Sequence, residues 1–181
     1  MADTRPGRPD EIIDRGPVRL RRYREDDLDA VFQAVTDSLD HLRPWMPWAA
    51  DYTRQAAAEF LAASARGWAD GSEYNYAIVA DGALAGGAGL MARIGPGALE
   101  IGYWVRQGYT RRGLATAASA ALVEQAFRLP GVERVEIVVD ELNVASAGVP
   151  RKLGFAEAER RPLDMPPPAG TGLGVVWRLA R

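Results

Sequence analysis

The sequence predicts a mixed α/β layer fold, and three observations support this fold class. Segments that alternate apolar and polar residues, as strands do, recur along the chain of 181 residues. Other segments repeat apolar residues every three or four positions, as amphipathic helices do. Glycine or proline marks most of the joints between them. The predicted order is β-α-α-β-β-β-α-β-α-β-β, with no internal repeat and no second composition zone.

Composition excludes several classes of protein. Apolar residues make up 48% and charged residues 25%, as in ordinary globular domains, and the net charge of -2 argues against a dedicated nucleic-acid binder. The chain has no cysteine, which excludes disulfides, thiol nucleophiles and thiolate metal sites. The polar first nine residues lack the apolar core of a signal peptide, and no apolar run is long enough to span a membrane. We expect a cytoplasmic protein with no membrane, nucleic-acid or metal partner.

The N-terminal segment divides into an arm and a first strand. Residues 1–15 are predicted to be a mobile arm, and residues 16–181 to form a single domain large enough for a substantial core. Val18 and Leu20 then alternate with arginines in a strand that ends at Tyr23.

Two helices follow the first strand. Acidic residues open the first helix, where they complement the helix dipole, and Pro44 ends it. The second helix is predicted over residues 53–69 and ends at Gly71. The apolar stripe of the first helix comprises Leu28, Val31, Phe32, Val35 and Leu39.

The loop between these helices is unusually rich in large side chains, because Trp45, Met46 and Trp48 lie between two prolines. One interpretation is a hydrophobic plug that packs one helix onto the next, since large aromatic side chains are usually partly buried. The other is one wall of a substrate groove, since loops often carry specificity. The residues alone leave both interpretations open.

A hairpin is predicted next. Alternating residues over 74–78 form its first strand, Asp81-Gly82 is a two-residue turn signal, and the return strand runs from Leu84 to Ile94. The return strand contains the glycine-rich run 86–89, which does not open a helix as a dinucleotide-binding fingerprint would. We interpret this run as a bulge or as close packing of the backbone.

The central stretch is a strand that feeds a helix. Residues 99–106 alternate in two faces, and from Gly113 the period changes to that of a helix. The joint, 107–113, contains Arg111 and Arg112, so free N–H groups, the helix dipole and two guanidinium groups could bind a pyrophosphate there. An ordinary turn with solvated arginines is the alternative. The apolar stripe of the helix comprises Leu114, Ala118, Ala121, Leu122, Ala126 and Leu129.

The C-terminal part adds three strands and a short helix. A buried strand ends at Asp140, and a helical region follows with Asn143 as a plausible N-cap and Gly154 as its stop. The last two strands are predicted over 155–160 and 174–179.

At this point the chain resembles the GCN5-related N-acetyltransferase (GNAT) family, in particular the branch that acetylates N-termini of ribosomal proteins. Three stretches carry the resemblance, and they occur in the family's order within residues 17–180. They are Ile101–Val105 with Arg111–Ala115, Asn143-x-x-Ser146 with Arg151–Phe155, and Arg43–Trp48. The resemblance implies a mostly antiparallel mixed sheet that is splayed at its centre and covered by helices on both faces.

The resemblance also implies acetyl-CoA as the cofactor and coenzyme A as the product. Two positions depart from the family pattern: Thr110 stands where glutamine or arginine is common, and Arg111 where glycine is frequent. Lys152 and Arg151 could meet the adenosine phosphate or be a solvated turn. The residues implied in cofactor binding are Trp104, Val105, Arg106, Gln107, Thr110, Arg111, Arg112, Gly113, Leu114, Ala115, Asn143 and Ser146.

For catalysis, the resemblance implies that a glutamate removes the amine proton through water and that a serine hydrogen-bonds to the departing sulfur. Glu100 and Ser146 occupy these positions, while an exposed carboxylate and a first-turn serine are the structural alternatives. An N–H group near Val105 is the expected oxyanion donor. The only histidine, His41, lies at a helix C-terminus, where a cation is favourable for structure alone.

The acceptor is expected to be a primary amine that attacks the thioester directly. A peptide α-amine has a pKa near 8 and lysine one near 10.4, so a water-relayed carboxylate suits the α-amine of a protein or peptide better. The expected substrate-binding residues are Trp45, Met46, Trp48 and Glu100. A small amine such as an aminoglycoside or polyamine, or a degenerate coenzyme-A-binding module, are the alternatives, and a monomer or a homodimer is expected.

Overall fold

One sheet organises the chain in the computed structural model, which describes residues 7–181. Its eight strands are ordered β1-β2-β3-β4-β5-β6-β8-β7. The strands are β1 (Ile12–Arg15), β2 (Val18–Arg22), β3 (Glu73–Ala80), β4 (Ala83–Met91), β5 (Ala98–Val105), β6 (Arg134–Asp140), β7 (Ala156–Pro162) and β8 (Leu173–Ala180). The helices are α1 (Leu28–Thr36), α2 (Leu39–Leu42), α3 (Arg54–Asp70), α4 (Leu114–Arg128) and α5 (Val144–Lys152), with 3-10 turns η1 (Glu25–Asp27), η2 (Pro47–Ala49) and η3 (Gln107–Tyr109). The predicted mixed α/β class is confirmed.

The sheet is splayed at its centre, between β5 and β6. Every other pair of neighbouring strands is antiparallel, but β5 and β6 run parallel and pair only through 98–100 and 134–136. The remainder of β5, residues 101–105, is paired on its β4 side alone. Main-chain groups on its other side are therefore available to a further partner.

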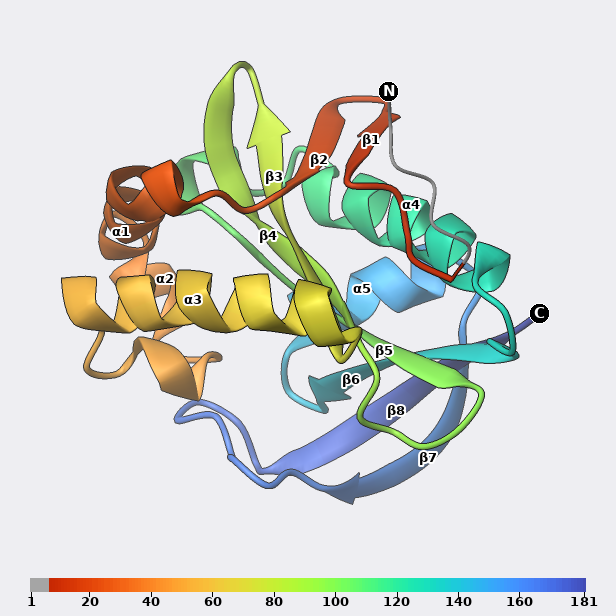
Figure 1. The fold of residues 1–181 in the computed structure, drawn as a ribbon. Coiled ribbons are helices and arrows are strands. Elements are labelled where there is room, and N and C mark those ends of the chain that lie inside the picture. Colours follow the sequence, from red (N-terminus) through yellow and green to blue (C-terminus); the bar gives the residue numbers. More distant parts are fainter. Residues whose placement is uncertain (1–6) are drawn as a thin grey trace.

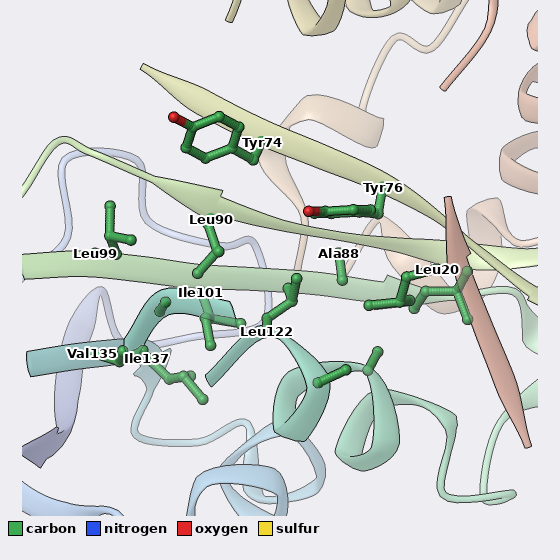
Figure 2. Packing of buried hydrophobic residues seen from close by; sticks show 14 of the residues in the cluster. Leu20, Tyr74, Tyr76, Ala88, Leu90, Leu99, Ile101, Leu122, Val135 and Ile137 are labelled. Carbon is green, nitrogen blue, oxygen red and sulfur yellow. The ribbon is translucent and has the colours of Figure 1, made fainter. Parts of the chain in front are cut away.

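Helices cover both faces of the sheet (Figure 1). Helix α4 packs on one face, where Figure 2 shows Leu122 close to Leu90 and Ile101. Helices α1 and α3 pack on the other face against Ala77 and Leu84. The apolar stripe predicted for α4 is buried, which confirms the 3.6-residue period read from the sequence.

The N-terminal segment corrects one prediction. Residues 12–15, predicted as part of a mobile arm, form β1 and pair with β2, while residues 1–6 lie outside the described residues. The side chain of Ile13 packs against the main core, and the phenol of Tyr76 donates a hydrogen bond of 2.8 Å to the carbonyl of Asp10. A four-residue strand is too short to show a period, so its partners determine it.

The first helix is also interrupted, because α1 ends at Thr36 and a separate turn, α2, follows. The buried hydroxyl of Ser38 donates to the carbonyl of Ala34 (2.7 Å), and a serine that bonds four residues back competes with helix continuation. The same hydroxyl accepts a hydrogen bond from the N–H of Gln107 (2.9 Å). The break therefore ties the end of α1 to the loop that follows β5.

The glycine run of β4 confirms the close-packing interpretation. The register between β3 and β4 shifts at Ile78/Val79, which marks a bulge. A Cβ on Gly86 would lie 2.3 Å from the carbonyl oxygen of Trp104, and one on Gly87 would lie 2.5 Å from both Trp104 Nε1 and the Tyr23 hydroxyl. Glycine is needed here because two other groups occupy the space of a side chain.

We predict that a buried ion pair at the start of α1 makes stability depend on pH. Asp27 accepts two hydrogen bonds of 2.7 Å from the guanidinium of Arg21 and one of 2.7 Å from the N–H of Arg24. Burial alone would raise the pKa of Asp27, but these contacts outweigh it and hold the pKa below its usual range. At pH 7, Asp27→Asn should therefore lower the free energy of unfolding by about 2–3 kcal/mol.

The sign follows from the lowered pKa: the stabilisation is present above about pH 4 and is lost as the pH falls through the pKa of the folded state. Urea unfolding of both proteins at pH 7, 5 and 3 tests this. The difference between wild type and Asp27→Asn should shrink at pH 3, and a constant difference would contradict the assignment.

Candidate active site

Two cavities open on the splayed centre of the sheet and meet there. The first, here called the α4 cavity, has a volume of about 580 Å³ and lies between β5, the start of α4 and α5. The second, the aromatic cavity, has a volume of about 390 Å³ and lies over β4 and β5 on the side of α3. The residues that line both are Trp45, Met46, Tyr103, Trp104, Asn143 and Ser146.

The α4 cavity contains the predicted anion site. Gly113 is the N-cap of α4 with φ +74°, and the first-turn residues 114–116 line the cavity. First-turn N–H groups have no partner within their own helix, and the helix dipole adds partial positive charge. The side chains of Arg111 and Lys152 line the same cavity, and the exposed His41 lies at its rim. This arrangement suits a phosphate-bearing ligand.

Most of the residues implied in cofactor binding line this cavity, but three do not. The guanidinium of Arg106 pairs with Asp37, and its N–H donates to the carbonyl of Ala85 (2.8 Å). The N–H of Gln107 is bound to the Ser38 hydroxyl. The side chain of Arg112 pairs with Asp81 (2.6 Å) and lies over the ring of Tyr109. The structure therefore gives these three residues contacts within the protein. The residues that do line the cavity are Trp104, Val105, Thr110, Arg111, Gly113, Leu114, Ala115, Asn143 and Ser146.

Arg111 explains why glycine is frequent at its position. Its φ is +61°, in the left-handed region that a side chain disfavours. The loop retains the conformation that glycine would adopt freely, at a cost of about 1 kcal/mol. Thr110 uses its hydroxyl within the loop, where it donates to the carbonyl of Gln107 (3.0 Å).

The aromatic cavity is lined by aromatic side chains from four segments of the chain. Tyr23 packs edge-on against Phe60, with ring centroids 5.1 Å apart. Trp48 packs edge-on against Trp104 at 6.2 Å and is 44% exposed. In the loop of Trp45, Met46 and Trp48, Met46 packs against a small core cluster, as the plug interpretation expects, and all three residues line the aromatic cavity. Their part in substrate binding stays a prediction.

Glu100 lines the aromatic cavity and is only 8% exposed. The guanidinium of Arg93 binds both of its oxygens, at 2.6 and 3.2 Å. A carboxylate can accept about four hydrogen bonds, so this pair leaves room for a water molecule. Glu136 stands opposite in the β5–β6 register, but it is bound by Arg134 (3.2 Å) and Arg178 (2.8 Å) and lines neither cavity.

Ser146 lies where the two cavities meet, at the start of α5. The side chain of Asn143 caps this helix by accepting a hydrogen bond of 3.1 Å from the N–H of Ser146. The Ser146 hydroxyl donates to the phenol of Tyr103 (3.1 Å), which in turn donates to the carbonyl of Ser146 (2.9 Å). Burial raises the pKa of Tyr103 to about 12, so the phenol is neutral at pH 7. These bonds connect the unpaired half of β5 to α5.

The profile of the acetyltransferase (GNAT) domain matches residues 18–156. The chain belongs to the GNAT acetyltransferase family. This match confirms the resemblance found in the sequence. The Bacillus subtilis (strain 168) protein named "Putative ribosomal N-acetyltransferase YdaF" is 26% identical over 147 residues, which cover 77% of this GNAT chain and 78% of that relative.

Two solved structures share the fold with TM-scores of 0.85. One is RimL, a ribosomal L7/L12 α-N-protein acetyltransferase in complex with coenzyme A, which is 21% identical and covers 94% of this chain and 98% of its own. The other is Mycobacterium smegmatis RimJ in complex with a CoA disulfide, which is 24% identical and covers 98% of this chain and 90% of its own. At these identities the likeness shows the shared GNAT fold.

Sequence reasoning missed three residues of the site: Tyr23, Arg93 and Tyr103. Tyr103 lies in the alternating stretch 99–106, where the period marks a face of the strand but does not show that the buried tyrosine hydroxyl needs a partner. Tyr23 directly follows β2, and Arg93 lies two residues after the end of β4. The alternation of a strand does not extend to these positions, so it cannot predict which side chains line a cavity. Across residues 7–181, no cluster of side chains suits a metal ion, and no helix has the length and apolar character needed to cross a bilayer.

We predict that two substitutions at Arg111 separate its backbone from its charge. Arg111→Ala retains the left-handed strain, and Arg111→Gly removes it. The free energy of unfolding of the glycine variant should therefore be about 1 kcal/mol higher than that of the alanine variant. Both lose the guanidinium and should bind acetyl-CoA about tenfold more weakly than wild type. Urea unfolding and calorimetric titration measure the two effects. An alanine variant as stable as the glycine variant would contradict the strain.

Proposed function

We propose that this GNAT acetyltransferase moves the acetyl group of acetyl-CoA to the N-terminal α-amine of a protein or peptide. The observation that carries the proposal is the meeting of the two cavities at Trp104 and Ser146. A thioester that enters from the α4 cavity and an amine that enters from the aromatic cavity would meet there.

The cofactor half of the proposal rests on the anion site and on the splay. The first-turn N–H groups of α4, with Arg111, would hold the pyrophosphate. The pantetheine arm carries amide groups, and residues 101–105 of β5 have main-chain groups without a β6 partner. The arm would therefore extend along β5 towards Ser146. The coenzyme A bound to RimL and RimJ supports this choice of cofactor.

The chemistry requires an amine without its proton and a protonated leaving group. The neutral amine would attack the thioester carbon, forming the C–N bond and an oxyanion that a main-chain N–H near Val105 would stabilise. Glu100 would receive the amine proton through a water molecule. The C–S bond would then break, with the Ser146 hydroxyl hydrogen-bonded to the departing sulfur. The thiolate would take a proton from water to leave as coenzyme A, and Glu100 would return the amine proton to the solvent.

The acceptor follows from amine acidity and from the charges in the aromatic cavity. About one-tenth of an α-amine is neutral at pH 7, but less than a thousandth of a lysine. The acidic groups that line the cavity are Glu100 and Asp140, and Asp140 accepts hydrogen bonds from the N–H groups of Leu142 and Gly172. With Glu100 paired to Arg93, the cavity offers little attraction to a polycation such as an aminoglycoside. The description of RimL as an α-N-protein acetyltransferase and that of YdaF as a ribosomal N-acetyltransferase support a protein acceptor.

The proposed function is tested by a thermal-shift titration with acetyl-CoA followed by thiol release with a panel of amines. Saturable stabilisation is expected, because a ligand selective for the folded state raises its stability. Release with peptides that begin with Ala or Ser supports the proposal. Release only with polyamines or aminoglycosides would indicate a small-amine acetyltransferase, and stabilisation without any release would indicate a coenzyme-A-binding module.

We predict that Glu100→Gln lowers kcat by about 100-fold at pH 7, because an amide cannot take up the amine proton. The KM for acetyl-CoA should not change, since Glu100 does not line the α4 cavity. Steady-state kinetics with a peptide acceptor measure both constants. Glu136→Gln is the matched control, because Glu136 is a buried glutamate that pairs with Glu100 in the β5–β6 register but lines neither cavity. An equal loss in both variants would attribute the effect to structure instead of to the base.

A further inference from the structure

The hydroxyl of Tyr23, a residue that lines the aromatic cavity, is a buried polar group without a hydrogen-bond partner in the described part of the fold. The side chain is 8% exposed, and its oxygen has no hydrogen-bond partner among residues 7–181. An unpaired buried hydroxyl is unfavourable, so such a group in a cavity calls for a ligand. Its ring is fixed by edge-on packing against Phe60.

A second polar group converges on the same point. The position that a Cβ of Gly87 would occupy lies 2.5 Å from the Tyr23 oxygen and 2.5 Å from Trp104 Nε1. The two atoms are therefore no more than about 5 Å apart, close enough for one oxygen atom to bond to both. Gly87 pairs with Trp104 in the β4–β5 register, and directly opposite residues share a face of the sheet.

The chemistry of these two groups defines what they could bind. An indole N–H is only a donor, and a phenol can donate or accept. Burial raises the pKa of the Tyr23 phenol well above its usual range, and the carboxylate of Asp27 adds to the shift, so the phenol stays protonated. Neither of the two groups carries a positive charge that would balance a carboxylate, and the charged side chains that act on the phenol, Asp27 and Arg21, are paired with each other. The phenol and the indole therefore suit a neutral oxygen atom.

The position relative to β5 matches an acceptor that presents its amine to the reaction centre. Glu100, Gly102 and Trp104 alternate along one face of β5, each about 7 Å from the next. An amine above Gly102 would lie between the proposed base and Trp104. The substituents of its first residue would then extend towards Tyr23 and Trp104, the two groups that cover Gly87.

We propose, on the basis of the proposed function, that Tyr23 and Trp104 form an acceptor subsite that binds a neutral oxygen of the residue carrying the amine. That oxygen is either the side-chain hydroxyl of a first serine or the main-chain carbonyl of the first residue. Tyr23 is thus a substrate-recognition residue on the side of the site opposite to the cofactor.

The experiment compares wild type and Tyr23→Phe on two peptides that differ only in their first residue, Ser or Ala, at saturating acetyl-CoA. Phenylalanine keeps the packing on Phe60 and removes only the unpaired hydroxyl. We expect kcat/KM to fall about three- to tenfold while the melting temperature stays the same or rises. A structural hydroxyl would give the opposite pattern. Ser119→Ala removes another buried, unpaired hydroxyl that lines neither cavity, and it should leave kcat/KM unchanged.

Each outcome decides the proposal. A loss confined to the Ser peptide assigns the subsite to the side-chain hydroxyl, and an equal loss on both peptides assigns it to the main-chain carbonyl. Unchanged kcat/KM on both peptides in Tyr23→Phe would overturn the subsite while leaving the N-terminal acetyltransferase intact. A wild-type protein that acetylates neither peptide would overturn the proposed function and the subsite with it.

Discussion

The short parallel contact between β5 and β6 is the constraint on which the site depends. Three residue pairs hold the two strands together at one end, and beyond them β5 continues with a neighbour on one side only. An unpaired strand edge inside a protein exposes main-chain donors and acceptors that must find a partner. The protein links this part of β5 to α5 through the side chain of Tyr103, whose phenol is hydrogen-bonded to Ser146 and leaves the main-chain groups of the edge without a partner from these bonds. The remaining edge is open between the two cavities, which is where a ligand with its own amide groups can be accommodated.

The site also requires the glycine run of β4, residues 86–89, because Gly86 and Gly87 leave space for Trp104. In a sheet covered on both faces, an indole of this size can lie flat only where the neighbouring strand carries no side chain. Gly86 and Gly87 provide that space, so the carbonyl and the ring of Trp104 approach β4 closely. The indole then reaches both cavities. The same absence of side chains therefore serves packing and site geometry together.

How much of this was predictable from the sequence depends on the range of the contacts. The helices α3, α4 and α5 follow from local signals, since Thr53 caps α3, Asn143 caps α5 and the buried stripe of α4 has a clear period. Ser146 was assigned from a motif on α5, and Glu100 from its position next to the motif of β5, and both roles stay predictions. The strand β1 could not be predicted because four residues are too few to show a period, although its partner β2 is the next strand in the chain. The break at Ser38 involves a contact with Gln107, which is far away in the sequence.

The assignment of side chains to cavities was harder for the same reason. Arg106 directly precedes the β5–α4 joint and Arg111 and Arg112 lie in it, yet of these three only Arg111 lines the α4 cavity. Arg106 and Arg112 are engaged by Asp37 and Asp81, which come from distant segments, so no local pattern distinguishes them. Arg111 differs from the other two in its left-handed φ, which turns the main chain as a glycine would at the point where this residue lines the cavity.

The side chains of β5 point alternately to its two faces, and this alternation separates the proposed roles within the site. Glu100 and Trp104 lie on the face that forms the aromatic cavity, whereas Tyr103 and Val105 belong to the face that meets α4 and α5. Because side chains alternate along a strand, Glu100, which is proposed to take the amine proton, lies on the opposite face of β5 from Tyr103. The phenol of Tyr103 is hydrogen-bonded to Ser146, which is proposed to contact the thioester sulfur. The acetyl group has to pass between these two sets, and the splay is the place where no neighbouring strand blocks it. Glu100 and Ser146 can therefore have different environments, although Glu100 lies on β5 and Ser146 lies on α5, the helix that is hydrogen-bonded to β5 through Tyr103.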